Sequence, residues 1–174
     1  MNSNYKVNRS YLNFIHARNF FPEDEAESCR LTVKDLLHYN PNPYGRQIPD
    51  FNLIFPESDM LFGGMLGDYV TLDEERSGTF RRPYNNLIHF EDFDNLTEWR
   101  LAVALEDTLF KTYSHTSGAR TALEGYEFDY HNDEEWCLET TLNLKQNDAI
   151  FYRPWVFHSF EEKLILCYYL KGES

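Results

Sequence analysis

The sequence lacks several features that mark common functional classes. No apolar run approaches the roughly 20 residues of a membrane-spanning helix, and the N-terminus has no apolar core of the kind found in secretory signals. The 3 cysteines are widely spaced, with no CxxC pair and no zinc-site spacing, which suits reduced thiols. Basic residues number 16 against 29 acidic ones, and a net charge of −13 repels nucleic-acid phosphates. We therefore expect a cytoplasmic protein whose partners include neither membranes nor nucleic acids.

Aromatic residues, in contrast, are abundant. The 174 residues include 14 Phe and 12 Tyr, and 42% of the chain is hydrophobic, which is typical of a folded protein rich in strands. No internal repeat divides the chain. We expect a single domain, 1–174, in which residues 1–83 hold a helix with entry strands and loops, and residues 84–172 form the β core.

One amphipathic helix is predicted within residues 22–40. Pro22 suits the first helical position, and the three acidic residues that follow it complement the positive end of the helix dipole. Asn40-Pro41 ends the helix. The apolar residues that recur at three- and four-residue steps, and so form one face to bury, are Ala26, Cys29, Val33, Leu36 and Leu37.

Short strands separated by turn-like sequences dominate the chain after Tyr84. The turns include Glu106-Asp107, Gln146-Asn147-Asp148 and Glu161-Glu162. Strands with little helix between them predict an antiparallel β domain of jelly-roll or barrel type, with the helix over one face. The predicted strands are Asn86–Phe90, Arg100–Leu105, Leu109–Ser114, Leu138–Leu144, Ala149–Arg153, Val156–Phe160 and Leu164–Leu170.

Two histidines are followed two residues later by a carboxylate, in His89-Phe90-Glu91 and His131-Asn132-Asp133. With 6 His and 29 acidic residues among 174, about one such pair arises by chance, so the motif alone decides nothing. On a strand, however, residues i and i+2 point to the same face, so His89 and Glu91 can converge on one point. The alternative is an acidic turn with a partly buried histidine.

His158 is the candidate for a third ligand. It lies between Phe157 and Phe160 in a predicted strand, where an uncompensated polar ring is unfavourable. The 67 positions from Glu91 to His158 leave room for the intervening strands, whereas the 27 from His131 fall short of the roughly 40 residues required. Two histidines and one carboxylate on one face, with positions left open, are typical of non-haem Fe(II) oxygenases.

Three segments resemble the Fe(II)/2-oxoglutarate-dependent dioxygenase superfamily, and in particular its prolyl-hydroxylase-like members. "NNLIHFEDFD" (85–94) resembles the strand with the proximal His-x-Asp/Glu pair, and "LNLKQNDAIFYRPWVFHSF" (142–160) resembles the later strands that lead to the distal His. "FIHARNFFPEDEAESCRLTVKDLL" (14–37) is similar to the entry strand and first helix. The resemblance implies a double-stranded β-helix, a jelly-roll or cupin-like fold, over most of the chain.

The resemblance also implies Fe(2+) and 2-oxoglutarate as cofactors, with His89, Glu91 and His158 as metal ligands. Glu91 departs from the commoner Asp, and its longer side chain moves the ligand oxygen. The family places the basic residue that grips the far carboxylate of 2-oxoglutarate on the strand after the distal His. Lys163, five positions past His158, matches that place if it is not simply a solvent-exposed turn lysine, and Tyr84 is expected to donate to the same carboxylate. Rival anchors are Lys111, Arg100 and Arg120.

The activity implied is hydroxylation of a C–H bond in an amino acid or a peptide side chain, with release of succinate and CO2. Arg153 and Trp155 are candidates for the substrate side, although Trp155, like Tyr84, equally fits barrel packing. The basic residues Arg76, Arg81 and Arg82 are expected to form a solvated loop rather than a lid. Two other classes stay open: a non-oxygenase cupin, whose usual H-x-H motif this sequence lacks, and a structural or binding jelly roll without catalytic iron.

Overall fold

The computed structural model describes residues 13–39, 46–47, 70–83, 86–92, 97–125 and 127–172. No helix in these ranges is long and apolar enough to cross a membrane. Within them, the elements in chain order are β1 (Phe14–Ala17), α2 (Glu23–Tyr39), β2 (Arg46–Gln47), β3 (Val70–Leu72), β4 (Thr79–Arg81), β5 (Thr97–Ala104), β6 (Thr108–His115), two 3₁₀ turns (Ala122–Glu124 and Asp133–Glu135), β7 (Trp136–Leu144), β8 (Ala149–Tyr152), β9 (His158–Phe160) and β10 (Ile165–Gly172).

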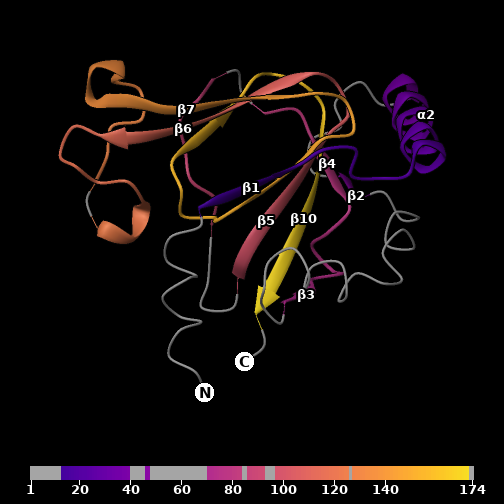
Figure 1. The fold of residues 1–174 in the computed structure, drawn as a ribbon, viewed down its shortest axis with the longest axis horizontal. Helices are drawn as coiled ribbons and strands as arrows, with labels where there is room; N and C mark the ends of the chain where they lie inside the picture. Colours follow the sequence, from indigo (N-terminus) through magenta and orange to yellow (C-terminus); the bar gives the residue numbers. More distant parts are fainter. Residues whose placement is uncertain are drawn as a thin grey trace.

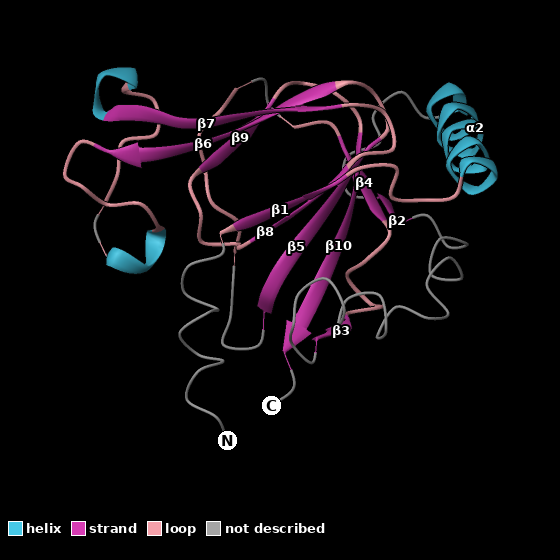
Figure 2. Ribbon diagram, in the orientation of Figure 1, coloured by secondary structure: helices cyan, strands magenta, loops and turns pink. Residues whose placement is uncertain are grey.

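The strands form two antiparallel sheets in the described part of the chain. The larger sheet has the order β1-β8-β5-β10-β4-β2, with β3 also paired to β10, and the smaller has the order β7-β6-β9. Figure 1 shows the β6–β7 hairpin at one side of the molecule and α2 at the other. Strands far outweigh helix in Figure 2, so the predicted antiparallel β architecture with one helix is confirmed and matches a cupin-like sandwich.

Buried side chains form one layer between the sheets and another beneath α2. Leu101 of β5 belongs to the cluster that includes Cys29 of α2, whereas its neighbour Ala102 belongs to the cluster that includes Phe110 and Phe160 of the smaller sheet. Successive residues of a strand point to opposite faces, so both faces of the larger sheet are covered. A one-residue slip of β5 would exchange the two layers, which fixes its register.

The turn before β8 ties the N-terminal strand to the core. Asn147 adopts a left-handed conformation with φ 71°, which asparagine tolerates well. The Asp148 carboxylate accepts a hydrogen bond from the backbone N–H of Lys145 at 3.0 Å and lies 3.1 Å from Nε2 of His16 in β1. Strand β1 pairs along β8, and β8 pairs with β5. These contacts hold the end of β8, and with it Tyr152, in a fixed position.

The predicted strands agree with β5 to β10 to within three residues at each end. The segment Asn86–Phe90 differs, because His89 makes an isolated antiparallel bridge to His158 instead of a continuous strand. Strands β3 and β4 lie in the part of the chain expected to hold entry strands and loops, and both pair with β10. Tyr84 lies outside the described residues.

Candidate metal centre

His89 and His158 lie directly opposite each other across an antiparallel bridge. Each backbone N–H donates to the carbonyl oxygen of the other residue at 2.9 Å. The two imidazole rings are 4.4 Å apart between centroids. Residues paired in this way project to the same side of a sheet, so the bridge brings together two side chains that are 69 positions apart in the sequence.

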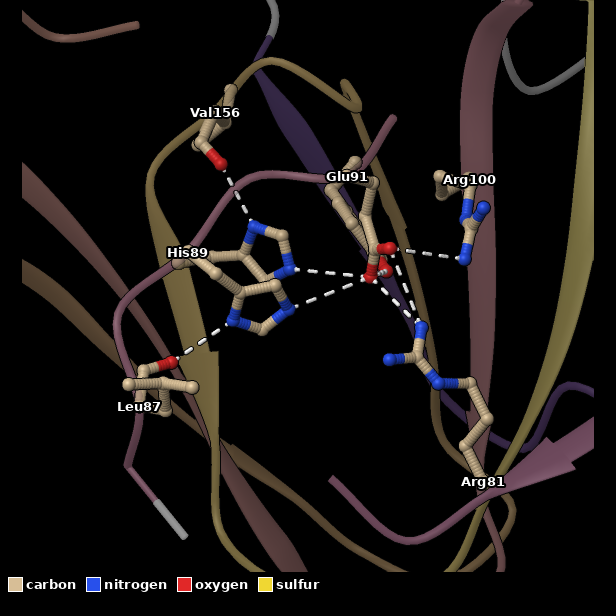
Figure 3. A network of polar contacts seen from close by, with 8 residues as sticks. Arg81, Leu87, His89, Glu91, Arg100 and Val156 are labelled. Atoms are coloured by element: carbon tan, nitrogen blue, oxygen red, sulfur yellow. Dashed lines mark hydrogen bonds and ion pairs between the residues drawn. The ribbon is translucent and has the colours of Figure 1, made fainter. Parts of the chain in front are cut away.

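Glu91 joins the two histidines from the same face of its segment. Its backbone N–H donates to the carbonyl of Pro154 at 2.8 Å, which fixes the chain just after His89. Its Oε1 lies 3.5 Å from Nε2 of His89 and 3.8 Å from Nε2 of His158 (Figure 3). One ligand atom from each of the three residues lies within 4.8 Å of the others. The structure therefore brings together the three residues predicted as metal ligands.

The other ring nitrogen of each histidine is held by the backbone. Nδ1 of His158 lies 2.7 Å from the carbonyl oxygen of Val156, and Nδ1 of His89 lies 2.9 Å from that of Leu87 (Figure 3). A carbonyl oxygen only accepts, so we assign the proton of each ring to Nδ1. Each Nε2 then carries a lone pair directed toward Glu91, which is the usual orientation of histidines that bind metals.

The donor set fits a divalent metal ion. Nε2 of His158 is buried and has no hydrogen-bond partner among the residues that the structure describes, although buried polar atoms are nearly always paired. Two nitrogen lone pairs and a carboxylate oxygen that face one another repel unless a cation lies among them. Two imidazoles and one carboxylate, with further positions left open, are the ligand set of non-haem Fe(II) oxygenases.

Burial and neighbouring charges shift the pKa values of these groups. Burial lowers the pKa of His158 to about 4, with a further contribution from His89, so its ring is neutral near pH 7 and able to bind a metal. Burial alone would raise the pKa of Glu91. The pKa of Glu91 is nonetheless held well below its usual range, and the positive charge of Arg100 contributes to this lowering.

Three further side chains contact the Glu91 carboxylate. Nη1 of Arg81 donates to its two oxygens at 3.2 and 3.3 Å, and Nη2 of Arg100 lies 3.3 Å from Oε2. The phenol of Tyr152, which is fully buried, donates to Oε1 at 3.3 Å. Arg100 stands between Tyr152 and Tyr169 in the strand register, and its guanidinium stacks 3.5 Å from the centre of the Tyr169 ring.

The sequence did not predict that Arg81 and Tyr152 contact Glu91. Arg81 was expected in a solvated loop, and that expectation is wrong, because Arg81 ends strand β4 and reaches Glu91. Arg81 is paired with Ile165 of β10, 84 positions away, so no local pattern indicates its direction. Tyr152 follows three apolar residues in β8 and resembles an ordinary core aromatic. Arg100 was named only as a rival anchor for 2-oxoglutarate.

The other predicted site residues lie elsewhere or outside the described ranges. Lys163 is exposed in the turn between β9 and β10. Arg153 is 2% exposed, and its Nη1 contacts the Glu98 carboxylate at 3.1 Å. This buried ion pair indicates a role in stability. Trp155 is half-buried, and its carbonyl accepts a hydrogen bond from Ala122. Of the rival anchors, Lys111 lies in β6, the central strand of the smaller sheet, and contacts Asn86. Arg120 is exposed.

A groove of about 860 Å³ opens beside the segment that carries His89. Its wall includes Leu87 and Ile88, which precede His89 directly, and the aromatic residues Tyr130 and Trp136. The two aromatic rings are stacked, with centroids 5.5 Å apart and planes 19° from parallel. This groove is apolar and aromatic, with polar side chains at His131 and Asp133.

No protein-family model and no curated protein sequence matches this chain. Several solved structures share its fold. The non-haem alpha-ketoglutarate-dependent carbocyclase SnoK from nogalamycin biosynthesis matches with a TM-score of 0.59 at 11% identity, over 99% of this chain and 84% of SnoK. The epimerase SnoN in complex with Fe3+, alpha-ketoglutarate and nogalamycin RO gives 0.53 at 14% identity, over 97% of this chain and 82% of SnoN. HygX from Streptomyces hygroscopicus, with nickel and 2-oxoglutarate bound, gives 0.51 at 12% identity, over 99% and 87% of the two chains.

These similarities establish the fold alone. Identities this low do not carry function from one protein to another. Of these three structures, SnoK is a non-haem alpha-ketoglutarate-dependent enzyme, and SnoN and HygX each hold a metal with that co-substrate. These three do not include a prolyl hydroxylase, so the prolyl-hydroxylase-like subtype stays a prediction.

Proposed function

We propose that this protein is an Fe(II)- and 2-oxoglutarate-dependent enzyme that oxidises a C–H bond of an organic substrate. The observation that carries the proposal is the convergence of donor atoms from His89, Glu91 and His158 within 4.8 Å of one another. The fold shared with SnoK, SnoN and HygX supports it. Iron bound by these ligands, with 2-oxoglutarate and O2 beside it, supplies the oxidising power that no amino-acid side chain has.

The side chains of the protein hold and orient this centre. The carbonyls of Val156 and Leu87 fix the two imidazole rings, and Tyr152 donates to Oε1 of Glu91. Partners of this kind orient metal ligands and increase their affinity for the ion. The ring of Phe110 stacks against His158 with centroids 5.7 Å apart, and His158 is 0% exposed, so this side of the centre is shielded from water.

We also propose that the two sheets form a double-stranded β-helix. The run β8-β5-β10-β4 lies in one sheet and β7-β6-β9 in the other. The segment that carries His89 pairs with the start of β9 and extends the smaller sheet by a fourth, short member.

Arg100 is our candidate for the group that binds the far carboxylate of 2-oxoglutarate. Its side chain is 2% exposed and lies next to the proposed metal ligands, whereas Lys163 is exposed in a surface turn. Nε and Nη2 of Arg100 are buried without a hydrogen-bond partner among the described residues. A buried guanidinium whose donors make no hydrogen bond suits a carboxylate, although its Nη2 also lies 3.3 Å from Oε2 of Glu91. The role of Lys163 stays a prediction.

For the substrate, we propose a C–H bond in an amino acid or a peptide side chain, hydroxylated with release of succinate and CO2. The carbocyclase and the epimerase among the similar structures indicate that this fold also accommodates other outcomes of C–H oxidation. The groove beside Leu87 and Ile88 is our candidate for the substrate side, because it adjoins the segment of His89 and offers aromatic surface for an apolar group.

The proposal is tested by anaerobic titration of the purified protein with Fe(II) and 2-oxoglutarate. The chelate of the two gives a weak charge-transfer band in visible light. We expect the band with the wild type and with His131→Ala, which changes an exposed histidine outside the centre. We expect no band with His158→Ala, which removes one proposed ligand.

The result that would overturn the proposal is the absence of the band in the wild type, together with no thermal stabilisation by Fe(II). A band of equal strength in His158→Ala would place the metal elsewhere in the protein. Circular dichroism of each variant shows whether the fold is retained, so loss of the site is distinguished from loss of structure.

A further inference from the structure

The Glu91 carboxylate lies between the two histidines and two arginines. Figure 3 shows His89 on one side of the carboxylate and Arg81 and Arg100 on the other. Arg81 contacts both carboxylate oxygens at 3.2 and 3.3 Å, and Nη2 of Arg100 lies 3.3 Å from Oε2. A carboxylate that binds a metal thus already has two cationic partners, which compete with the ion for the same negative charge.

Neither arginine is a freely solvated surface group. Arg100 is 2% exposed, its guanidinium stacks on Tyr169, and its Nε and Nη2 have no hydrogen-bond partner among the described residues. The side chain of Arg81 is 35% exposed. Charges buried to this degree are weakly screened by water and salt, so they act strongly on another charge placed beside them.

The formal charges of Glu91, Arg81 and Arg100 indicate which combination of ligands the site favours. With neutral histidines, one carboxylate and two guanidinium groups leave the cluster with a net positive charge before any metal binds. A divalent cation alone increases that positive charge in a partly dehydrated site. A dicarboxylate that binds at the same time supplies two negative charges and offers Arg100 the acceptors that it lacks.

We infer that Arg81 and Arg100 make the metal ion and a dicarboxylate bind as a pair, each strengthening the other, so that the metal alone is held weakly. This inference rests on the proposed function and adds a rule for how the site is loaded. Coupling between two ligands is reciprocal, so the dicarboxylate also binds weakly when the metal is absent. The arginines therefore disfavour a site that holds iron without its co-substrate.

The test measures Mn²⁺ binding by equilibrium dialysis, with and without saturating 2-oxoglutarate. Mn²⁺ takes the same nitrogen and oxygen ligands and allows the binding to be measured without turnover. The variant is Arg81→Gln, since Arg81 is partly exposed and its loss is tolerated more readily than that of Arg100. The control is Arg120→Gln, which removes the same charge from an exposed position. Pyruvate, a 2-oxo acid with a single carboxylate, serves as a second comparison.

In the wild type and in Arg120→Gln, we expect 2-oxoglutarate to increase the affinity for Mn²⁺ on the order of 100-fold, within the usual range of coupling between two ligands. Pyruvate should increase it much less. Arg81→Gln should bind Mn²⁺ alone several-fold more tightly than the wild type, and its gain from 2-oxoglutarate should fall by at least about fivefold.

Three outcomes would overturn the inference alone: equal affinity of Arg81→Gln and the wild type for Mn²⁺, weaker binding by the variant, or equal effects of pyruvate and 2-oxoglutarate. Each would mean that the arginines orient Glu91 without opposing the metal. Failure of the wild type to bind Mn²⁺ with or without 2-oxoglutarate would instead remove the proposed function, and the inference with it. The two failures are therefore distinguishable in one data set.

Discussion

Acid should destabilise the metal-free protein through His158, over a pH range that the structure defines. The ring is fully buried, and its pKa falls to about 4 from an ordinary value of 6.5. Between these two values the unfolded chain binds a proton at His158 and the folded chain does not. The free energy of unfolding therefore falls as pH decreases from 6.5 to 4, and this contribution is constant above that range.

The size of the effect follows from the same two values. At about 1.4 kcal/mol for each pKa unit, the gap between 6.5 and about 4 corresponds to about 3 kcal/mol lost by pH 4. Glu91 acts in the same direction at lower pH. Because its folded pKa is depressed, its stabilisation is complete above the ordinary carboxyl value of 4.5 and is lost as pH falls through the folded value. The His158 effect is thus nearly complete where the Glu91 effect begins.

Urea denaturation at pH 7, 6, 5 and 4 in the presence of a chelator measures this loss. The comparison variant is His158→Asn, whose amide can still donate to the carbonyl of Val156 but does not titrate. The wild type should lose about 3 kcal/mol more than His158→Asn between pH 7 and pH 4. His131→Asn, at an exposed position, should behave as the wild type. Parallel stability curves for the wild type and His158→Asn would refute the argument that His158 is buried in its neutral form.

Three further predictions concern the partners of the site and a buried arginine outside it. Tyr152→Phe removes the phenol that donates to Glu91, and Mn²⁺ affinity should fall by about 10-fold with the fold retained, as measured by dialysis. Glu91→Gln leaves two arginines without their counter-charge, so urea denaturation should show a loss of about 3 kcal/mol along with the loss of Mn²⁺ binding. Arg153→Met should also cost stability, because it removes the buried ion pair with Glu98, yet Mn²⁺ affinity should equal that of the wild type. Altered metal affinity in Arg153→Met would assign Arg153 to the site after all.

The sequence predicted those parts of the fold and site that depend on local patterns. The helix begins after Pro22 because the acidic first turn and the apolar spacing act within a few residues. His89 and Glu91 share a face because side chains alternate along an extended segment. The distance along the chain to His158 was sufficient to select the His89-Glu91 pair over the His131-Asp133 pair. Each of these arguments needs only neighbouring residues or a count of positions.

The arginines required information that the sequence does not display. Arg100 reaches the site because β5 pairs with both β8 and β10, in a register that places it beside Tyr152 and Tyr169. Those partners are 52 and 69 positions away. Lys163 was chosen as the anchor because the resemblance places a basic residue on the strand after the distal His. The structure places Lys163 exposed in the turn before that strand, whereas Arg100 is a buried cation on a neighbouring strand, so the choice between them stays a prediction.

The arrangement of the His158 ring argues against a purely structural jelly roll. A buried histidine in a structural core has both ring nitrogens paired, because an unpaired polar atom costs about 1–3 kcal/mol. Here Nδ1 is paired with a carbonyl, while Nε2 is buried 3.8 Å from a carboxylate oxygen and has no hydrogen-bond partner in the described part of the chain. Phe or Leu at this position would remove that cost and fit between Phe110 and Phe160. A fold that keeps a destabilising ring in its core, close to donor atoms of His89 and Glu91, agrees with the proposed metal site.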